Sequence, residues 1–317
     1  MSNEVFNTVN PATGEDIETF HTYKPAEVEN VLRCSEEAFK SFRKSSTYQR
    51  AELLHQLAEA LRKNKESLAK TITTEMGKIF SEAQAEVEKC ALEADWYAEN
   101  GPGMLADQPA PTGSTEAYVS FRPLGPILGI MPWNFPLWQA TRFCIPALLS
   151  GNVVLVKHSP NTQRSSLELE RMFLEAGFPE GVFKNLILRT EDIVNVINDR
   201  RVQGASVTGS VRAGSAVASE AGKVIKKTVM ELGGSDAFIV LEDADIPKAV
   251  AAGIKGRFGN TGQVCLAAKR FLLVDSIADE FESKFVEGHK SAQDGRPDGF
   301  QESARPDGAR RPARWAG

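Results

Sequence analysis

An alternation of short apolar runs with helical stretches between residues 126 and 240 constrains the fold more than any other feature of this chain. The runs GNVVLVK, FKNLILRT and GASVTGS have the character of strands, and the helical stretch SLELERMFLEAG separates the first two. Strands separated by helices predict a parallel sheet, and therefore an α/β fold. Ligands bind such sheets at the carboxyl ends of the strands. The residues predicted at these ends are Lys157, Thr208, Gly209 and Ser210.

The regions on either side of this alternation have different patterns. Residues 25–101 are predicted to be helical, because apolar residues recur at i, i+3, i+4 and i+7. Cys34 and Cys90 fall inside these helices and are expected to be small core or helix-face residues. The segment EAYVSFRPLGP predicts two extended pieces around a turn, and KKTVMELGGSDAFIVL predicts two strands around a Gly-Gly turn.

Composition excludes several classes of function. A length of 317 residues suits one large or two medium domains, and a net charge of -5 argues against a nucleic-acid partner. The chain has no apolar run long enough to cross a membrane, and its polar start does not resemble a targeting peptide. Four scattered cysteines without a CxxC motif indicate free thiols in the cytoplasm. Four scattered histidines provide no ligand spacing for a metal.

The last segment, residues 289–317, differs in kind from the rest of the chain. It contains no Ile, Leu, Val or Met and is dense in Arg, Pro, Gly, Ala and Asp. Such a segment cannot bury enough apolar surface to order itself, so we expect it to be disordered. It begins abruptly after the helical SIADEFESKFVEG, which is more typical of a reading-frame shift than of a basic interaction tail.

Cys265 is the first candidate for chemistry, because GNTGQVCLAA presents it on a glycine-bearing turn. A helix beginning after this cysteine would stabilise the reactive thiolate. The alternative is a buried, inert cysteine. A cysteine protease would need a histidine base, and none of the four histidines lies in a recognisable motif. Glu231, which precedes a Gly-Gly turn, is a candidate acid–base partner or a solvated strand-end residue.

A second group of residues has features of a cofactor site. VTGSVRAG places Gly209 and Gly214 across a predicted strand-to-helix junction, where glycine and a helix N-terminus favour a phosphate. This is not the GxGxxG fingerprint, and a plain helix cap at Ser210 explains it equally well. Lys157 is either a ribose ligand or an ordinary exposed lysine.

Five motifs together resemble the aldehyde dehydrogenase superfamily, and most of all its succinate-semialdehyde dehydrogenases. They are PWNFP (132–136), VLVKHSP (154–160), VTGS (207–210), MELGGSD (230–236) and NTGQVCLAAKR (260–270). They stand in the order and spacing of the superfamily, and the resemblance covers roughly residues 5 to 288. It implies a Rossmann-like cofactor domain followed by the first part of an α/β catalytic domain.

The resemblance also implies NAD(P)-dependent oxidation of an aldehyde to its carboxylic acid. Cys265 would attack the aldehyde to form a thiohemiacetal, while the amide of Asn134 and the backbone N–H of Cys265 hold the oxyanion. Hydride transfer to the nicotinamide would leave a thioester. Glu231 would then activate water, and could first deprotonate Cys265.

The same resemblance implies the cofactor-binding residues. They are Trp133, Lys157, His158, Ser159, Pro160, Gly209, Ser210, Gly214 and Leu232. NAD-preferring members of the superfamily often carry a glutamate where this chain has Pro160. A proline does not repel a 2′-phosphate, so we expect either NAD or NADP to serve.

For the substrate, Arg142 matches an arginine that in succinate-semialdehyde dehydrogenases resembles a carboxylate clamp. The expected substrate is therefore succinate semialdehyde, and the alternative is a structural arginine on the helix after PWNFP. Those enzymes often carry a second arginine where this chain has Gly259, and Arg257 is close to that place but displaced.

Members of the superfamily continue past the nucleophile with an E-x-F-G-P motif and a strand that completes the sheet of a homo-oligomer, and neither is found here. We therefore expect a truncated chain with a cofactor-binding domain over 1–228, a partial catalytic domain over 229–288, and an oligomerisation-type extended segment over 113–126. The alternatives are an inactive fragment that retains at most nucleotide binding, and a cofactor-independent esterase that uses Cys265.

Overall fold

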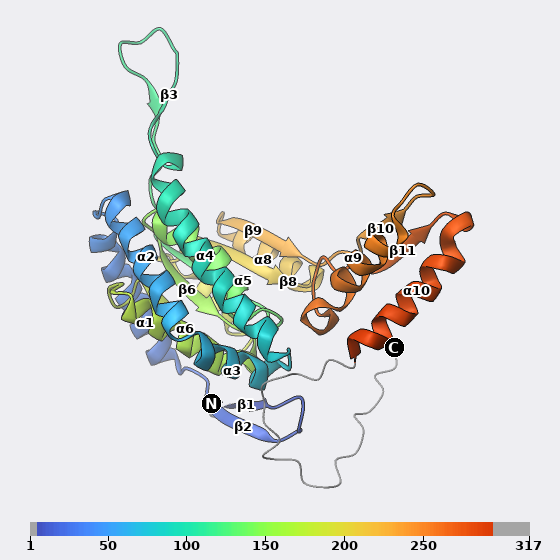
Figure 1. Cartoon of the computed structure of the whole chain (residues 1–317). Helices are drawn as coiled ribbons and strands as arrows, with labels where there is room; N and C mark the ends of the chain where they lie inside the picture. The colour runs from blue at the N-terminus through green and yellow to red at the C-terminus, as the bar shows by residue number, and fades with distance from the viewer. Residues whose placement is uncertain (1–4, 294–317) are drawn as a thin grey trace.

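The computed structural model describes residues 5–293, and its main body is built on one sheet of five parallel strands (Figure 1). In their order across the sheet the strands are β7 (Phe183–Asn185), β6 (Val153–Lys157), β5 (Pro126–Ile130), β8 (Gly204–Gly209) and β9 (Lys227–Leu232). All neighbouring strands are parallel, which confirms the predicted α/β fold. The strand expected over FKNLILRT is shorter than predicted, because residues 186–188 continue as a buried irregular segment.

Helices cover both faces of this sheet. The connecting helices are α5 (Trp138–Leu149), α6 (Gln163–Glu175), α7 (Ile193–Asn198) and α8 (Val211–Lys223). The amino-terminal helices are α1 (Pro25–Phe42), α2 (Thr47–Lys63), α3 (Lys65–Met76) and α4 (Phe80–Met104). All four residues of the predicted stripe Leu54, Leu57, Ala58 and Leu61 are fully buried, which confirms the helical pattern.

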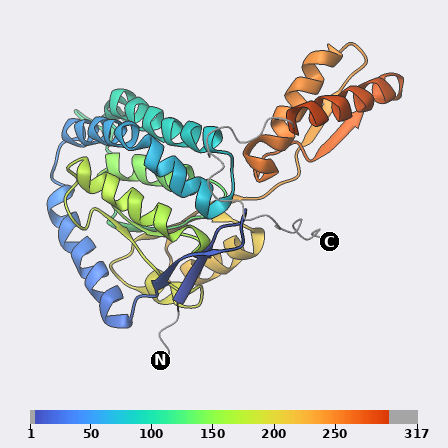
Figure 2. The same cartoon turned by 60° about the horizontal axis from the view of Figure 1, so that its bottom comes forward.

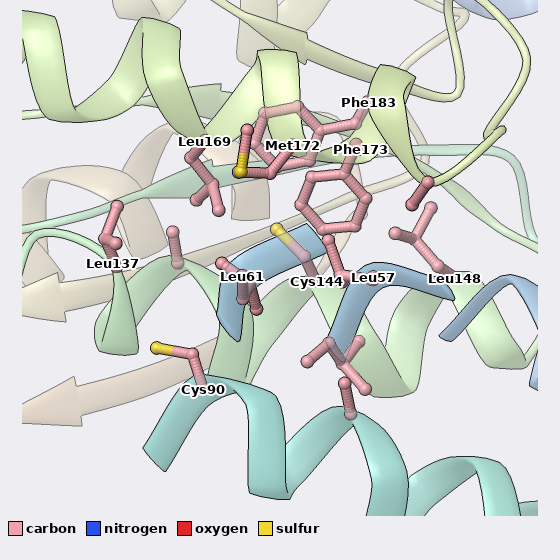
Figure 3. Packing of buried hydrophobic residues seen from close by; sticks show 14 of the residues in the cluster. Leu57, Leu61, Cys90, Leu137, Cys144, Leu148, Leu169, Met172, Phe173 and Phe183 are labelled. Atoms are coloured by element: carbon pink, nitrogen blue, oxygen red, sulfur yellow. The ribbon is translucent and has the colours of Figure 1, made fainter. Parts of the chain in front are cut away.

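Two cores result, one on each face of the sheet. The larger contains α2, α4, α5 and α6, and Figure 3 shows Leu57 and Leu61 of α2 in it together with Cys90 and Cys144. The smaller contains apolar residues of α1, α7 and α8 packed against β5, β6 and β8. Because both faces are covered, all five residues of β6 are buried.

Two antiparallel hairpins lie outside the main sheet. The first pairs β1 (Val5–Val9) with β2 (Asp16–His21). The second pairs β3 (Gln108–Pro109) with β4 (Tyr118–Val119), and it projects from the end of α4 (Figure 1). The extended segment expected over EAYVSFRPLGP therefore contributes β4 and the start of β5, with an irregular stretch between them.

A smaller unit follows β9 and extends away from the main body (Figure 2). It consists of β10 (Ala237–Val240), α9 (Ile246–Phe258), the 3-10 turn η2 (Gly259–Gly262), β11 (Arg270–Leu273) and α10 (Asp275–Gln293). The two strands are parallel and pack on α9 and α10 through a phenylalanine-rich core. The boundary expected between residues 228 and 229 falls inside β9, which pairs with β8 over Lys227–Leu232.

The expectation for the last segment is wrong at its start. Helix α10 continues to Gln293, beyond residue 288, and the ring of His289 stacks on Phe258 with the ring centroids 4.0 Å apart. The rest of that expectation, over residues 294–317, lies outside the described residues. Within the described part of the chain, no helix is long and apolar enough to cross a membrane.

Candidate active site

A pocket of about 380 Å³ lies where the carboxyl ends of the strands meet the smaller unit. The chain runs from β5 to β6 and β7 on one side and then returns to β8 on the other, so the order of the strands reverses beside β5. Such a reversal opens a crevice at the carboxyl ends of the strands. The lining residues are Pro132, Trp133, Asn134, Gln139, Arg142, Thr208, Gly209, Glu231, Leu232, Gly233, Gly262, Gln263, Val264 and Cys265.

This pocket brings together four residues that the sequence singled out from three distant segments. Asn134 follows β5, Arg142 lies on α5, Glu231 lies on β9, and Cys265 follows η2. The parallel register explains part of this arrangement, because Thr208 of β8 stands opposite Glu231 of β9. A thiol, a carboxylate, an amide and a guanidinium therefore surround one cavity.

Cys265 lies in a turn, as predicted, but no helix begins after it. The residues that follow are a turn and an irregular stretch leading into β11, so the thiolate has no helix N-terminus to stabilise it here. The turn is shaped instead by η2, where Asn260 and Thr261 both have φ near +55° and Gly262 has φ +75°. These left-handed conformations are uncommon for residues other than glycine.

The environments of the four cysteines distinguish Cys265 from the others. Cys90 and Cys144 are fully buried, and burial raises the pKa of each thiol well above its usual value. Cys34 is partly buried on α1, as expected. Cys265 alone among them lines the pocket, where it is partly exposed. The expected packing role of Cys34 and Cys90 agrees with their positions.

The amide of Asn134 is held against the Cys265 segment. Its Nδ2 donates to the Gln263 carbonyl at 2.8 Å, and Asn260 Nδ2 donates in return to the Asn134 carbonyl at 2.8 Å. An amide nitrogen carries two protons, so one remains for a ligand. Within the described residues, the buried Asn134 Oδ1 and Gln139 Oε1 have no hydrogen-bond partner, although both residues line the pocket.

A buried ion pair that sequence reasoning missed supports the Asn134 loop. Glu86 Oε1 accepts hydrogen bonds from the backbone N–H groups of Leu137 and Trp138, at 2.9 and 3.0 Å. Its other oxygen binds Lys78 Nζ, which also lies 4.1 Å from the centre of the Phe135 ring. Both charged side chains are completely buried. The available signal was a glutamate within the apolar stripe of α4, beside Ala83, Val87 and Cys90.

Four of the predicted cofactor-binding residues lie at or just after the end of β6 and are not part of the pocket lining: Lys157, His158, Ser159 and Pro160. Lys157 is the last residue of β6, and burial lowers its pKa, so it is not the ordinary exposed lysine of the alternative interpretation. Ser159 donates to Asn161 Oδ1, and Pro160 begins the 3-10 turn η1 (Pro160–Thr162). Trp133 is 37% exposed and does line the pocket.

The side chain of His158 is buried in the protein and holds neighbouring segments together. It is fully buried, with Nε2 2.8 Å from the Pro136 carbonyl and Nδ1 2.7 Å from Ser166 Oγ. Burial lowers the pKa of His158 to about 4. Because both ring nitrogens bind protein groups, only the backbone of this residue can meet a cofactor.

Three more of the predicted cofactor-binding residues, Gly209, Ser210 and Gly214, lie around the start of α8. Gly209 ends β8, and Ser210 caps the helix by accepting a hydrogen bond from the backbone N–H of Ala213 at 3.2 Å. Gly214 serves packing, because a Cβ there would lie 2.7 Å from Leu232 Cδ2. Gly209 and Leu232 line the pocket, whereas Ser210 and Gly214 are not part of its lining. The helix N-terminus itself is exposed and suits an anionic ligand.

Arg142, the residue predicted to bind the substrate, already forms an ion pair within the protein. Arg142 Nη2 lies 2.7 Å from Glu231 Oε2, and the two side chains are 39% and 47% exposed. Arg257, the displaced second arginine, donates to the Gly262 carbonyl at the rim of the pocket, at 3.3 Å. Gly259, which stands where those enzymes often carry a second arginine, begins η2.

Comparison with known proteins agrees with this geometry. The sequence profile described as the aldehyde dehydrogenase family matches residues 1–304. A succinate semialdehyde dehydrogenase [NAD(P)+] of Escherichia coli K12 is 44% identical over 290 residues, which cover 92% of this chain and 63% of that protein. An NADP+ succinate-semialdehyde dehydrogenase of Mycobacterium avium is 44% identical over 294 residues, which cover 92% and 62%.

Solved structures give the same result. The succinic semialdehyde dehydrogenase of Streptococcus pyogenes in complex with NADP+ matches with a TM-score of 0.88 at 38% identity, over 90% of this chain and 63% of that one. A succinate-semialdehyde dehydrogenase of Burkholderia pseudomallei matches with a TM-score of 0.87 at 30% identity, over 91% and 60%. The chain thus spans about three fifths of the length of these relatives.

Proposed function

This chain belongs to the aldehyde dehydrogenase family, and from that premise we propose that its pocket oxidises succinate semialdehyde to succinate with NAD or NADP. The observation that carries the proposal is that Cys265, Glu231, Asn134 and Arg142 line one cavity. Each of these side chains has a separate task in the reaction. The names of the relatives support the substrate and the cofactors.

Cys265 is the proposed nucleophile. Its sulfur, as the thiolate, adds to the aldehyde carbon, and the carbonyl oxygen becomes the oxyanion of a thiohemiacetal. The free proton of Asn134 Nδ2 stabilises that oxyanion, since the other proton is used by Gln263. Losing one such donor typically costs about 3 kcal/mol of transition-state stabilisation.

The cofactor side of the proposal rests on the crevice beside β5 and β8 and on the exposed start of α8. When bound, a nicotinamide supplies the hydride acceptor. Trp133, Gly209 and Leu232 line the pocket where the ring would be held. The start of α8 offers backbone N–H groups to the pyrophosphate. Lys157, the last residue of β6, is the proposed ligand of a ribose. Pro160 carries no negative charge that would repel the 2′-phosphate of NADP, which supports the use of either NAD or NADP.

Glu231 is the proposed base for release of the product. A thioester on Cys265 is hydrolysed by water that gives a proton to the Glu231 carboxylate, and the acid leaves as the thiol is restored. Arg142 would hold the far carboxylate of the substrate. Charge-assisted hydrogen bonds of this kind contribute about 1.5–3 kcal/mol.

We also propose how the chain is organised. Residues 5–232 form the cofactor-binding unit, because β9 is paired into its sheet, and the unit after β9 carries the nucleophile. The exposed apolar residues Tyr118 and Val119 on the projecting hairpin support contact with a second copy of the chain. The four free cysteines support a reducing compartment, the cytoplasm.

The proposal is tested by measuring NAD(P)H formation at 340 nm with succinate semialdehyde. Cys265→Ala should abolish turnover and keep nucleotide binding, because the cysteine supplies the nucleophile and not the cofactor site. Cys34→Ala, which changes a partly buried cysteine outside the pocket, is the matched control and should retain activity. Turnover by Cys265→Ala would contradict the mechanism. Nucleotide binding without turnover in the unaltered chain would favour a nucleotide-binding fragment, and ester hydrolysis without nucleotide would favour an esterase.

A further inference from the structure

The pocket contains one pairing that the proposed reaction does not use. Arg142, which would bind the carboxylate of the substrate, is bound instead by Glu231, at 2.7 Å. Glu231 is also the proposed base. The same contact therefore occupies the substrate-binding cation and the catalytic carboxylate.

The pair joins two elements that are far apart in the sequence. Arg142 is on α5, which follows the Asn134 loop, and Glu231 is on β9 at the edge of the sheet. Both side chains line the cavity and remain partly exposed to solvent. An ion pair between groups as exposed as these is weak, so a ligand that enters the pocket can replace either partner.

A second carboxylate lies close to Arg142 without taking the place of Glu231. Glu93 on α4 has a buried Oε2 for which the described residues provide no hydrogen-bond partner. Burial raises the pKa of Glu93 to about 7, and the neighbouring Arg142 counteracts this effect. Glu93 makes no ion pair with Arg142 among the described residues, so the direct competitor of an incoming carboxylate is Glu231.

We propose that the Arg142–Glu231 ion pair is a lock that the substrate opens. The carboxylate of a dicarboxylic semialdehyde displaces Glu231 from Arg142, and the released Glu231 becomes free to act as the base beside Cys265. No covalent bond changes in this step, because one carboxylate replaces another on the same guanidinium. An aldehyde without a carboxylate offers Arg142 no replacement for Glu231, so the substrate is selected through release of the base as well as through binding. This inference rests on the proposed function.

The test is a double-mutant cycle on the binding of succinate, the dicarboxylate product, to the full chain by titration calorimetry. Arg142→Gln should weaken binding by about tenfold or more, because the cation is lost. Glu231→Gln should tighten binding by about two- to fivefold, because the competing carboxylate is lost. In the Arg142→Gln background, Glu231→Gln should have no effect.

Three controls show whether the effects come from this ion pair. Succinamide, which has the same length and no charge, should not respond to Glu231→Gln. Glu242→Gln removes an exposed carboxylate outside the pocket and should leave succinate binding unchanged. Thermal unfolding of each variant shows that the fold is retained, as expected for side chains this exposed.

The possible outcomes separate the lock from the proposed function. If Arg142→Gln weakens binding while Glu231→Gln leaves it unchanged or weaker, the lock is overturned and the substrate assignment stands. If Arg142→Gln has no effect, both the lock and the assignment of a carboxylate substrate are overturned. The absence of succinate binding in all four proteins also overturns the lock, whereas binding by Glu231→Gln alone supports it.

Discussion

The two parallel sheets of this molecule differ in how much of their surface is covered. In the five-stranded sheet, helices pack on both faces, and Val154, Leu155 and Val156 of β6 are completely buried. In the two-stranded sheet, α9 and α10 bury one face, whereas Ile239 and Leu272 are 63% and 50% exposed. The same backbone pairing thus accompanies a closed core in one region and a half-covered sheet in the other.

The difference shows where mutations should matter. A residue in the main body is surrounded by packed atoms or by buried polar partners, so its loss leaves a cavity or an unpaired charge. A side chain on the exposed face of β10 or β11 is in contact with water in the folded chain as well as in the unfolded chain, so its loss should cost little stability. Substitutions at matched positions in the two regions can therefore confirm or break the comparison.

The largest expected effect concerns the buried pair of the main body. Glu86→Gln should lower the free energy of unfolding by about 3–5 kcal/mol, because Lys78 is left as an uncompensated buried charge. Urea unfolding followed by circular dichroism measures this change. Glu88→Gln, on the same helix but in a surface ion pair with Arg62, should cost about 1 kcal/mol or less. Equal costs for the two variants would contradict the role of burial.

The direct comparison of the two sheets comes next. Leu155→Ala should cost about 2–5 kcal/mol, because the removed atoms leave a cavity between two packed faces. Ile239→Ala on β10 should change the free energy of unfolding by about 0.5 kcal/mol or less, because that side chain is largely in water. Urea unfolding of both variants provides the measurement. A large loss at Ile239 would show that its face is covered in solution.

The dependence of stability on pH should also differ between the regions, through His158 in the main body. Its pKa is lowered from 6.5 to about 4 by burial, so the unfolded chain takes up a proton below pH 6.5 that the folded chain refuses. Stability present above pH 6.5 is therefore lost as the pH falls towards 4, by about 3 kcal/mol.

The measurement is urea unfolding at pH 7 and pH 4.5 for the unaltered chain and for His158→Gln. The variant should lose less stability on acidification, because glutamine does not titrate. Glu75 and Glu93 have raised pKa values of about 7 and act in the opposite direction, but they are present in both proteins and cancel in the comparison. An identical loss in the two proteins would show that His158 is not buried as a neutral group.

The smallest expected effect lies at the junction of the two regions. Gly214→Ala should gain about 0.5–1 kcal/mol of helix propensity, offset by the displacement of Leu232, so its stability should change little. Gly222→Ala, in the same helix with open space around it, should show the gain alone. Because Leu232 lines the pocket, only Gly214→Ala should weaken NADP binding, measured by titration. Equal behaviour of the two variants would remove the packing role of Gly214.

The pattern of the sequence predicted the part of the molecule that depends on local information. Strand and helix periods in 126–240 were sufficient for a parallel sheet, and the motifs around Asn134, Glu231 and Cys265 were sufficient to name the chemical groups of one pocket. No helix follows Cys265, because the glycine-bearing turn leads into an irregular stretch before β11, and the sequence pattern alone did not settle this point. The place of His158 was likewise hidden, since its partners Pro136 and Ser166 lie in other segments.

The sequence by itself therefore determined the fold class, the turn that presents Cys265 and the family. Only the tertiary structure decided that Glu231 binds Arg142 and that Glu86 supports the Asn134 loop. The physical reason is the separation along the chain of the residues that interact. Periodicity and turn chemistry act between neighbours in the chain, whereas these contacts depend on the order of the strands and on how α4 and α5 pack, which no local pattern encodes.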